Sequence, residues 1–187
     1  MNKFLKLPLF LAVVGGVCTA VLATTYAITN PIVVQRAETA RLAGYFSPFG
    51  LTTEDGANAK ELDVSADLLA KGVSMKVEIS HNGATLGVVY DAKVKGRNGD
   101  ISFQLSFKEG NYNTFAVIGD HSENEGFPGA DILGTLNDKL SGKPATQFTD
   151  ASQFYNNSDF IAGATAQSTA NLFPAIVAAA ADYAASL

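Results

Sequence analysis

The sequence predicts an α+β protein: an N-terminal transmembrane helix, then one twisted antiparallel sheet packed with helices. Three patterns indicate this class. The 23 residues from Leu7 to Thr29 carry no charge. Further on, stretches of alternating apolar and polar residues follow one another across short turns, as in an antiparallel meander. An Ala-rich apolar segment completes the pattern and is expected to pack as a helix on the sheet.

The uncharged run matches a membrane-spanning helix, which takes about 20 residues. It is longer than the ~7–15 apolar residues at the centre of a signal peptide, so an uncleaved anchor is expected over residues 1–30. Lys3 and Lys6 precede the run and favour a cytoplasmic N-terminus. We therefore expect a single-pass protein of the cell (inner) membrane, with the folded part on the periplasmic or extracellular side.

The composition of the exported part excludes several functions. It holds 11 basic and 18 acidic residues, a net charge of −7, so nucleic acid is not an expected partner. The lone Cys18 lies inside the apolar run, which leaves the domain without a disulfide or a thiol nucleophile. His81 and His121 lie in separate loops with no second ligand at metal spacing, so no metal site is expected.

Residues 31–50 are expected to continue the membrane helix as a juxtamembrane stalk that ends at Pro48 and Gly50. The extracytoplasmic domain is then predicted to occupy 51–187. Its first twelve residues are polar, and 63–72 reads as a short helix that stops at Gly72.

Strand-like alternation begins after this helix. Consecutive short turns imply an antiparallel meander. The strictest alternation places Ile101, Phe103, Leu105 and Phe107 on one face. The four predicted strands are 73–80, 84–95, 101–108 and 112–119.

The remainder is predicted to contain two helices separated by a loop. Residues 131–142 read as a short helix that ends at Gly142, and 143–158 as a loop. The Ala-rich segment 165–187 reads as a helix kinked at Pro174, because proline removes a helical hydrogen bond.

The most informative stretch is 159-DFIAGATAQSTA-170, at the start of that last helix. Thr165 fits the N-cap position, where its hydroxyl can accept from backbone N–H groups ahead. The same N–H groups and the positive end of the helix dipole favour a phosphate. Small and hydroxyl-bearing residues that would accommodate such a ligand surround it: Gly163, Ala164, Ser168 and Thr169.

This stretch resembles the attachment motif of the FMN-binding domain family, Asp-x-x-(Ser/Thr)-Gly-Ala-Thr, in which the phosphate of FMN is esterified to the threonine hydroxyl. The resemblance implies that Thr165 carries the FMN and that Asp159 is the motif acid, with Gly163 and Ala164 in their family positions. Ala162 stands where the family has Ser or Thr. A flavin transferase that uses FAD and Mg²⁺ would attach the flavin during maturation.

A second, partial match lies upstream, where 122-SENEGFPG-129 is similar to the family loop Ser-Glu-Thr-Pro-Gly-x-Gly. The resemblance implies that Glu123 and Phe127 make polar and stacking contacts with the flavin. The stretch 82-NGAT-85 repeats Gly-Ala-Thr, but Ile79 stands at its acid position and a strand pattern follows. Thr85 is therefore predicted to stay unmodified.

The layout of one anchor and one FMN domain is similar to that of the G subunit of the Rnf ion-translocating ferredoxin:NAD⁺ oxidoreductase complex. This implies an electron-relay subunit that works with the other membrane subunits of the complex. Three alternatives remain open: the C subunit of the Na⁺-translocating NADH:quinone oxidoreductase, a stand-alone cell-surface flavoprotein, and a non-redox interaction module in which Thr165 is only a helix cap.

Overall fold

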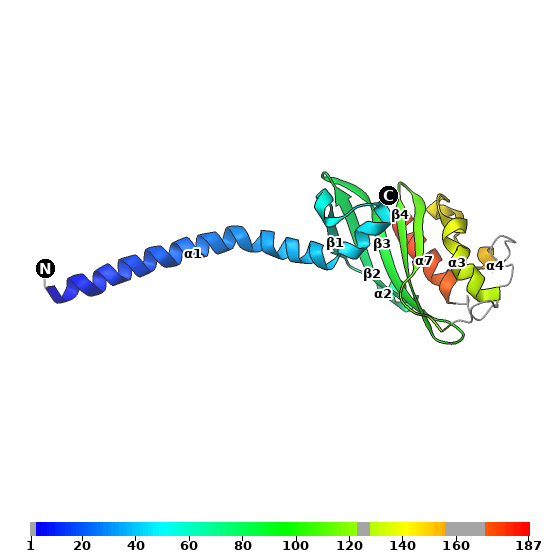
Figure 1. Ribbon diagram of the computed structural model, residues 1–187, viewed down its shortest axis with the longest axis horizontal. Helices are drawn as coiled ribbons and strands as arrows, with labels where there is room; N and C mark the ends of the chain where they lie inside the picture. Colours follow the sequence, from blue (N-terminus) through cyan, green and yellow to red (C-terminus); the bar gives the residue numbers. More distant parts are fainter. Residues whose placement is uncertain (1–2, 123–127, 156–170) are drawn as a thin grey trace. The chain divides into compact units, whose positions relative to one another are not determined.

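The computed structural model describes residues 3–122, 128–155 and 171–187 (Figure 1). The chain divides into two compact units, Met1–Arg41 and Leu42–Leu187. The first is a single helix, and the second contains the sheet with its covering helices.

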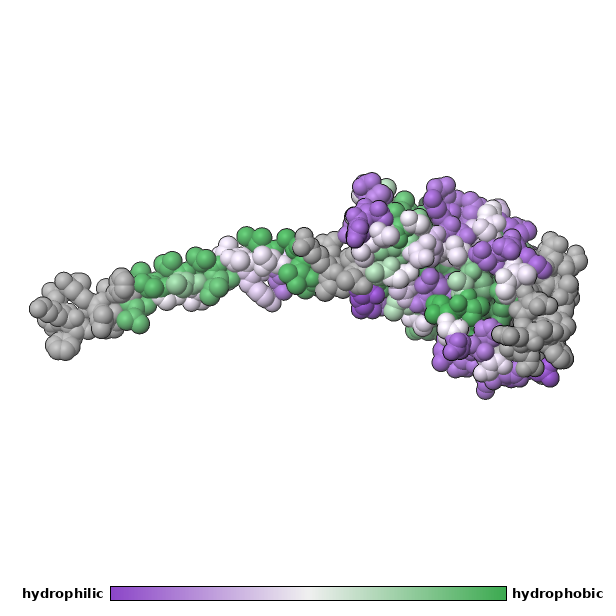
Figure 2. Space-filling view, in the orientation of Figure 1, coloured by the Kyte–Doolittle hydropathy of each residue, from purple (hydrophilic) through white to green (hydrophobic). Residues whose placement is uncertain are grey.

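Helix α1 (Lys3–Arg41) contains the apolar stretch Leu11–Val34, which is long and apolar enough to cross a membrane. Hydrophobic residues cover most of the described surface of this helix (Figure 2). Four threonine hydroxyls within the stretch donate to the carbonyl four residues earlier, at 2.8–2.9 Å, so these polar groups are satisfied inside the helix.

The α-helix ends at Arg41, nine residues before the predicted end of the stalk at Gly50. Residues Ala43–Phe49 instead form the 3₁₀ helix η1, which accommodates Pro48 and is closed by Gly50 at φ 68°. The sequence signal at Pro48 and Gly50 thus marks the end of η1, and the compact unit begins at Leu42 rather than at residue 51.

The sheet is an antiparallel meander in the order β1-β2-β3-β4-β5. The predicted antiparallel arrangement is confirmed, and the four predicted strands are observed with ends shifted by two residues at most. The fifth strand, β1, lies at an edge and was not predicted. The strands are β1 (Asn58–Leu62), β2 (Val73–His81), β3 (Ala84–Lys95), β4 (Asp100–Lys108) and β5 (Asn111–Val117).

One face of the sheet packs against helices α3 (Pro128–Leu140) and α7 (Leu172–Ala184) (Figure 1). The four residues of β4 predicted to share a face are all buried in this core. Side chains alternate along a strand, so β3 contributes to a cluster of buried residues on each face of the sheet. Tyr90 belongs to the core that includes α7, and Val89 belongs to a second, smaller cluster. The second cluster is closed by η1, whose Phe46 is fully buried.

Helix α7 corrects the prediction of a kink at Pro174. Pro174 is the third residue of α7, where its missing N–H would have had no partner within the helix. The predicted helical residues 165–170 lie outside the described residues.

The shorter elements deviate modestly from the predictions. Helix α2 (Ala66–Ala70) is capped by Ser65, whose side chain accepts from the Leu68 backbone N–H at 3.3 Å. Helix α3 begins three residues earlier than predicted and ends two residues earlier. The predicted loop 143–158 contains two short turns of helix, η3 (Ala145–Gln147) and α4 (Ser152–Tyr155).

Candidate functional site

The residues of the flavin motif and its partner loop lie outside the described residues. The structure instead shows where the chain enters and leaves these two segments. The residues concerned are Asp159, Ala162, Gly163, Ala164, Thr165, Ser168 and Thr169 in the motif, and Glu123 and Phe127 in the loop.

The two ends of the motif segment meet in the core. Phe154 stacks on Phe173, with ring centroids 4.5 Å apart and an interplanar angle of 13°. Both rings are fully buried, and the Phe148 ring also contacts Phe154, with ring centroids 4.3 Å apart. The chain that carries Thr165 therefore leaves the core and returns to it at one place.

A second contact ties the motif segment to the turn between β3 and β4. The side-chain amide of Asn171 donates to the backbone oxygen of Lys95 at 2.9 Å. Asn171, the first described residue after the motif segment, is thereby held at this turn.

The partner loop leaves the described chain at the same turn. A methyl group built on Gly99 would lie 3.5 Å from the side chain of Ser122, an ordinary van der Waals separation. Ser122 immediately precedes Glu123. The described residues that flank the two motif-like segments, Ser122 and Asn171, therefore both lie at the β3–β4 turn.

An unsatisfied polar atom lies at this junction. Nδ1 of His121 is shielded from solvent and has no hydrogen-bond partner among the residues that the structure describes. Such an atom suits a site that receives a polar ligand, because a buried group without a partner costs free energy. The sequence patterns gave His121 little weight, and its only signal was its position next to the partner loop.

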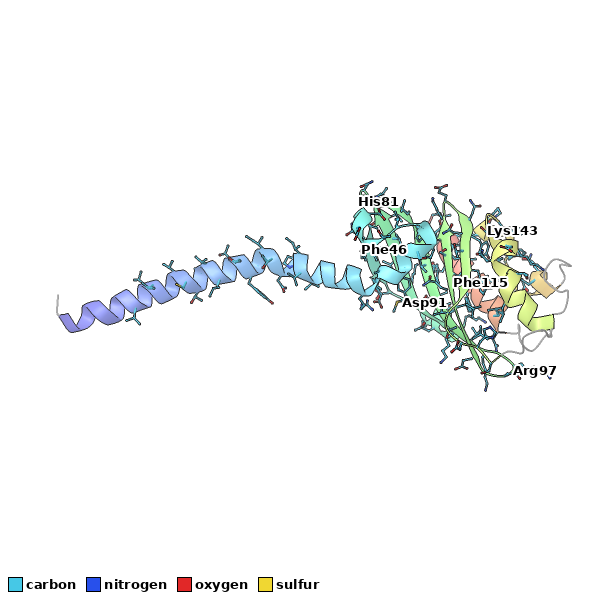
Figure 3. The ribbon with its side chains drawn as sticks, in the orientation of Figure 1. Phe46, His81, Asp91, Arg97, Phe115 and Lys143 are labelled. Atoms are coloured by element: carbon cyan, nitrogen blue, oxygen red, sulfur yellow. The ribbon has the colours of Figure 1, made fainter. Side chains whose placement is uncertain are left out.

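The β3–β4 turn is also a locally basic feature of an acidic domain. Lys93 pairs with Asp100 at 3.0 Å, and both side chains are more than half exposed. Lys95 and Arg97 are exposed, and Arg97 lies at the tip of the hairpin (Figure 3). Such cations would favour an anionic ligand nearby, though only weakly because exposed charges are screened.

The end of the sheet opposite the β3–β4 turn contains Thr85 and a cavity. Thr85 lies in β3, at the edge of a cavity of about 370 Å³, and about ten residues of strand, or roughly 30 Å, separate it from Lys95. The predicted strand after Gly-Ala-Thr is thus confirmed. No helix N-terminus of the described part of the chain lies beside Thr85, unlike the environment predicted for Thr165.

A half-buried polar cluster joins α7 to the sheet beside this cavity. Asp182 accepts hydrogen bonds from the Lys76 ammonium at 2.6 Å and from the Tyr90 hydroxyl at 2.7 Å. Burial, and then the hydrogen bond to Asp182, raise the pKa of Tyr90 well above its ordinary value. This cluster fixes α7 on the sheet.

Within the described ranges, no group of three His, Cys, Asp or Glu side chains could hold a metal ion. No protein-family model matches the chain, and no curated protein matches it as a relative. Function is therefore inferred from the motif and from the position of its flanks. The described flanks of the two motif-like segments both lie at the β3–β4 turn.

Proposed function

We propose that this protein is a membrane-anchored electron-relay subunit that carries FMN bound through its phosphate to Thr165. The observation that supports the proposal is that described residues flanking the two motif-like segments lie at the same turn. Asn171 binds the backbone of Lys95, and Ser122 lies against Gly99.

Attachment would be a transfer of the FMN moiety from FAD, catalysed by a flavin transferase with Mg²⁺. The hydroxyl oxygen of Thr165 forms a bond to the FMN phosphorus, and the phosphoanhydride bond to the AMP moiety breaks. AMP leaves, and the hydroxyl proton passes to the transferase. Asp159 is the acid that the enzyme would recognise, and Glu123 and Phe127 would contact the bound flavin.

Bound FMN supplies the redox chemistry, since its ring accepts electrons from one partner and passes them to another. The domain positions the ring and limits its exposure to water. A covalent tether suits a domain outside the cytoplasm, where a lost cofactor could not be replaced. Helix α1 would hold the domain at the membrane, with the N-terminus in the cytoplasm, next to the other subunits of an Rnf-type complex.

The test is intact mass after coexpression with a flavin transferase, followed by peptide mapping. We expect the mass of one FMN minus water on Thr165. Thr165→Ala should lose this mass while keeping the fold, because loss of a helix cap costs only about 1 kcal/mol. Thr85→Ala is the matched control and should keep the flavin. Colourless wild-type protein of unshifted mass would refute the proposal and leave the non-redox module.

The complex to which the domain belongs needs a separate experiment. The same site would serve in the C subunit of the Na⁺-translocating quinone reductase or in a stand-alone surface flavoprotein. Purification of the flavinylated protein from its native membrane, followed by identification of the copurifying subunits, distinguishes the three. We expect the membrane subunits of an Rnf-type complex, and recovery of the protein alone would favour the stand-alone alternative.

A further inference from the structure

We infer that the cavity between the sheet and the end of α7 binds a small aliphatic amine in its ammonium form, with the Glu78 carboxylate as its partner. The cavity has a volume of about 370 Å³, and all the residues that line it are described. Small-molecule sites span about 300–1,000 Å³, so this cavity suits a small ligand. Thr85 lines it, at the end of the sheet opposite the β3–β4 turn, and the inference therefore does not depend on the proposed function.

The strand register explains which side chains face this cavity. Residues paired across antiparallel strands lie on the same face of a sheet. Leu62 pairs with Lys76, and Glu78 pairs with Val88. Val88 belongs to the core that includes α7, so its partner Glu78 lies on the α7 side of the sheet. Helix α7 contacts β3 and β4, and its buried Tyr183 forms another part of the cavity wall.

Aliphatic side chains form an apolar part of the lining. Leu62 and Leu86 are half-buried, and Val88 is buried. Their methyl groups would contact the carbon chain of a ligand, and removal of these apolar surfaces from water would favour binding. The lining therefore suits an alkyl chain as well as a charged group.

Glu78 and Glu109 are carboxylates that line the cavity. The Glu109 side chain is 81% exposed and lies 3.8 Å from the Lys108 ammonium. Glu78 is half-buried, and Lys60, its neighbour across β1, is exposed and does not line the cavity. An ammonium group inside the cavity would therefore meet the Glu78 carboxylate in a partly buried place, where salt screens an ion pair less than at the surface.

Lys76 also lines the cavity, and an anionic ligand would depend on its charge. Its ammonium nitrogen lies 2.6 Å from the Asp182 carboxylate and 5.7 Å from the centre of the Tyr90 ring. An anion would have to compete with Asp182 for this ammonium, whereas a cation can meet Glu78 without breaking the pair. The charges therefore favour an amine over a carboxylate of the same length.

Titration of the full-length chain with butylammonium chloride tests the inference. The chain is produced without a flavin transferase, labelled at its leucine and valine methyl groups and held in detergent micelles. We expect saturable shifts of the methyl signals of Leu62, Leu86 and Val88. The signals of Leu11 and Leu22, which are exposed on α1, should stay unchanged, and this excludes uptake of the amine by the micelle as the cause.

Two ligands of similar length separate recognition of charge from apolar contact. Butan-1-ol keeps the carbon chain without the charge and should bind about threefold to tenfold more weakly than butylammonium. Butyrate should bind more weakly still, because its charge has the same sign as that of Glu78. Binding of butan-1-ol or butyrate as tight as that of butylammonium would overturn the inference, and so would the absence of shifts with all three ligands.

Glu78→Gln and Glu54→Gln are the matched variants. Both remove one carboxylate charge, but Glu54 is exposed in η2 (Thr53–Asp55) and does not line the cavity. Glu78→Gln should weaken butylammonium binding about threefold to tenfold and leave butan-1-ol binding unchanged, which a loss of folding would not do. Glu54→Gln should bind both ligands as the wild-type protein does. Equal affinity of Glu78→Gln and the wild-type protein for butylammonium would overturn the inference and leave the proposed function intact.

Discussion

Phe154→Leu tests whether the ring stack at the base of the motif segment prepares Thr165 for modification. The Phe154 ring is fully buried and, among the described residues, contacts the rings of Phe173 at 4.5 Å and Phe148 at 4.3 Å. Leucine keeps most of the apolar volume but cannot stack. Each aromatic pair contributes about 0.5–1.5 kcal/mol beyond its buried area, so the loss of both should cost about 1–3 kcal/mol.

The matched control is Phe103→Leu. Phe103 is also buried in the α7 core but has one ring partner, Phe115 at 5.3 Å, and lies in β4 away from the motif segment. Its replacement should cost about 0.5–1.5 kcal/mol by the same reasoning. Against a typical domain stability of about 5–15 kcal/mol, both variants should remain folded.

The assay combines urea unfolding, which gives the stability loss, with the initial rate of FMN attachment followed by intact mass. We expect Phe154→Leu to slow attachment severalfold more than Phe103→Leu, because its motif segment is no longer closed at the base. Equal attachment rates in the two variants would refute this reasoning and restrict the stack to a role in stability.

Three further predictions follow from the fold. Gly87→Ala should destabilise by at least about 1–3 kcal/mol in urea unfolding, because a methyl group there would collide with the backbone oxygen of Phe107 and lie 2.7 Å from the Phe49 ring. Gly44→Ala has open space and should be neutral. The raised pKa of Tyr90 favours its protonated form in the folded state, so its contribution to the free energy of unfolding is full below about pH 10, the unfolded value, and falls as pH rises further. Tyr90→Phe should therefore lose less stability between about pH 9 and 11 than the wild-type protein. An equal loss of stability would exclude Tyr90 as the cause. Asn171→Ala should cost about 0.5–1.5 kcal/mol in urea unfolding and slow FMN attachment, and an unchanged attachment rate would show that this hydrogen bond does not position the segment.

The main sheet could be predicted because its strands obey simple alternation. Ile101, Phe103, Leu105 and Phe107 alternate with polar residues, and the turns between strands use Gly, Asn and Asp. At the β2–β3 turn, Asn82 and Gly83 adopt φ of 53° and 80°, as a two-residue hairpin turn requires. Here the local pattern and the tertiary structure specify the same arrangement.

Strand β1 could not be predicted because its sequence, NAKEL, has no apolar alternation. Only Ala59 among its five residues is buried. A short, charged edge strand is common at the border of a sheet, where it discourages pairing with other chains. Its position depends on backbone pairing with β2, which no local pattern indicates.

Some residues of the candidate site could be named from the sequence, and others could be identified only in the structure. The residues predicted to bind FMN come from the resemblance of short stretches to family motifs, and they lie outside the described residues. The flanking residues could not be predicted. Phe154, Phe173 and Asn171 make their contacts with distant parts of the chain only through the fold.

The packing of η1 determines which soluble fragment of this protein can be studied. Leu42 and Phe46 cover Val77, Ile79 and Val89, and Asn113 donates to the backbone oxygen of Pro48 at 2.7 Å. A fragment that starts at residue 51 would expose this apolar surface to water and would be expected to aggregate. A fragment that starts at Leu42 keeps this surface covered and removes the apolar helix, which suits it to crystallisation.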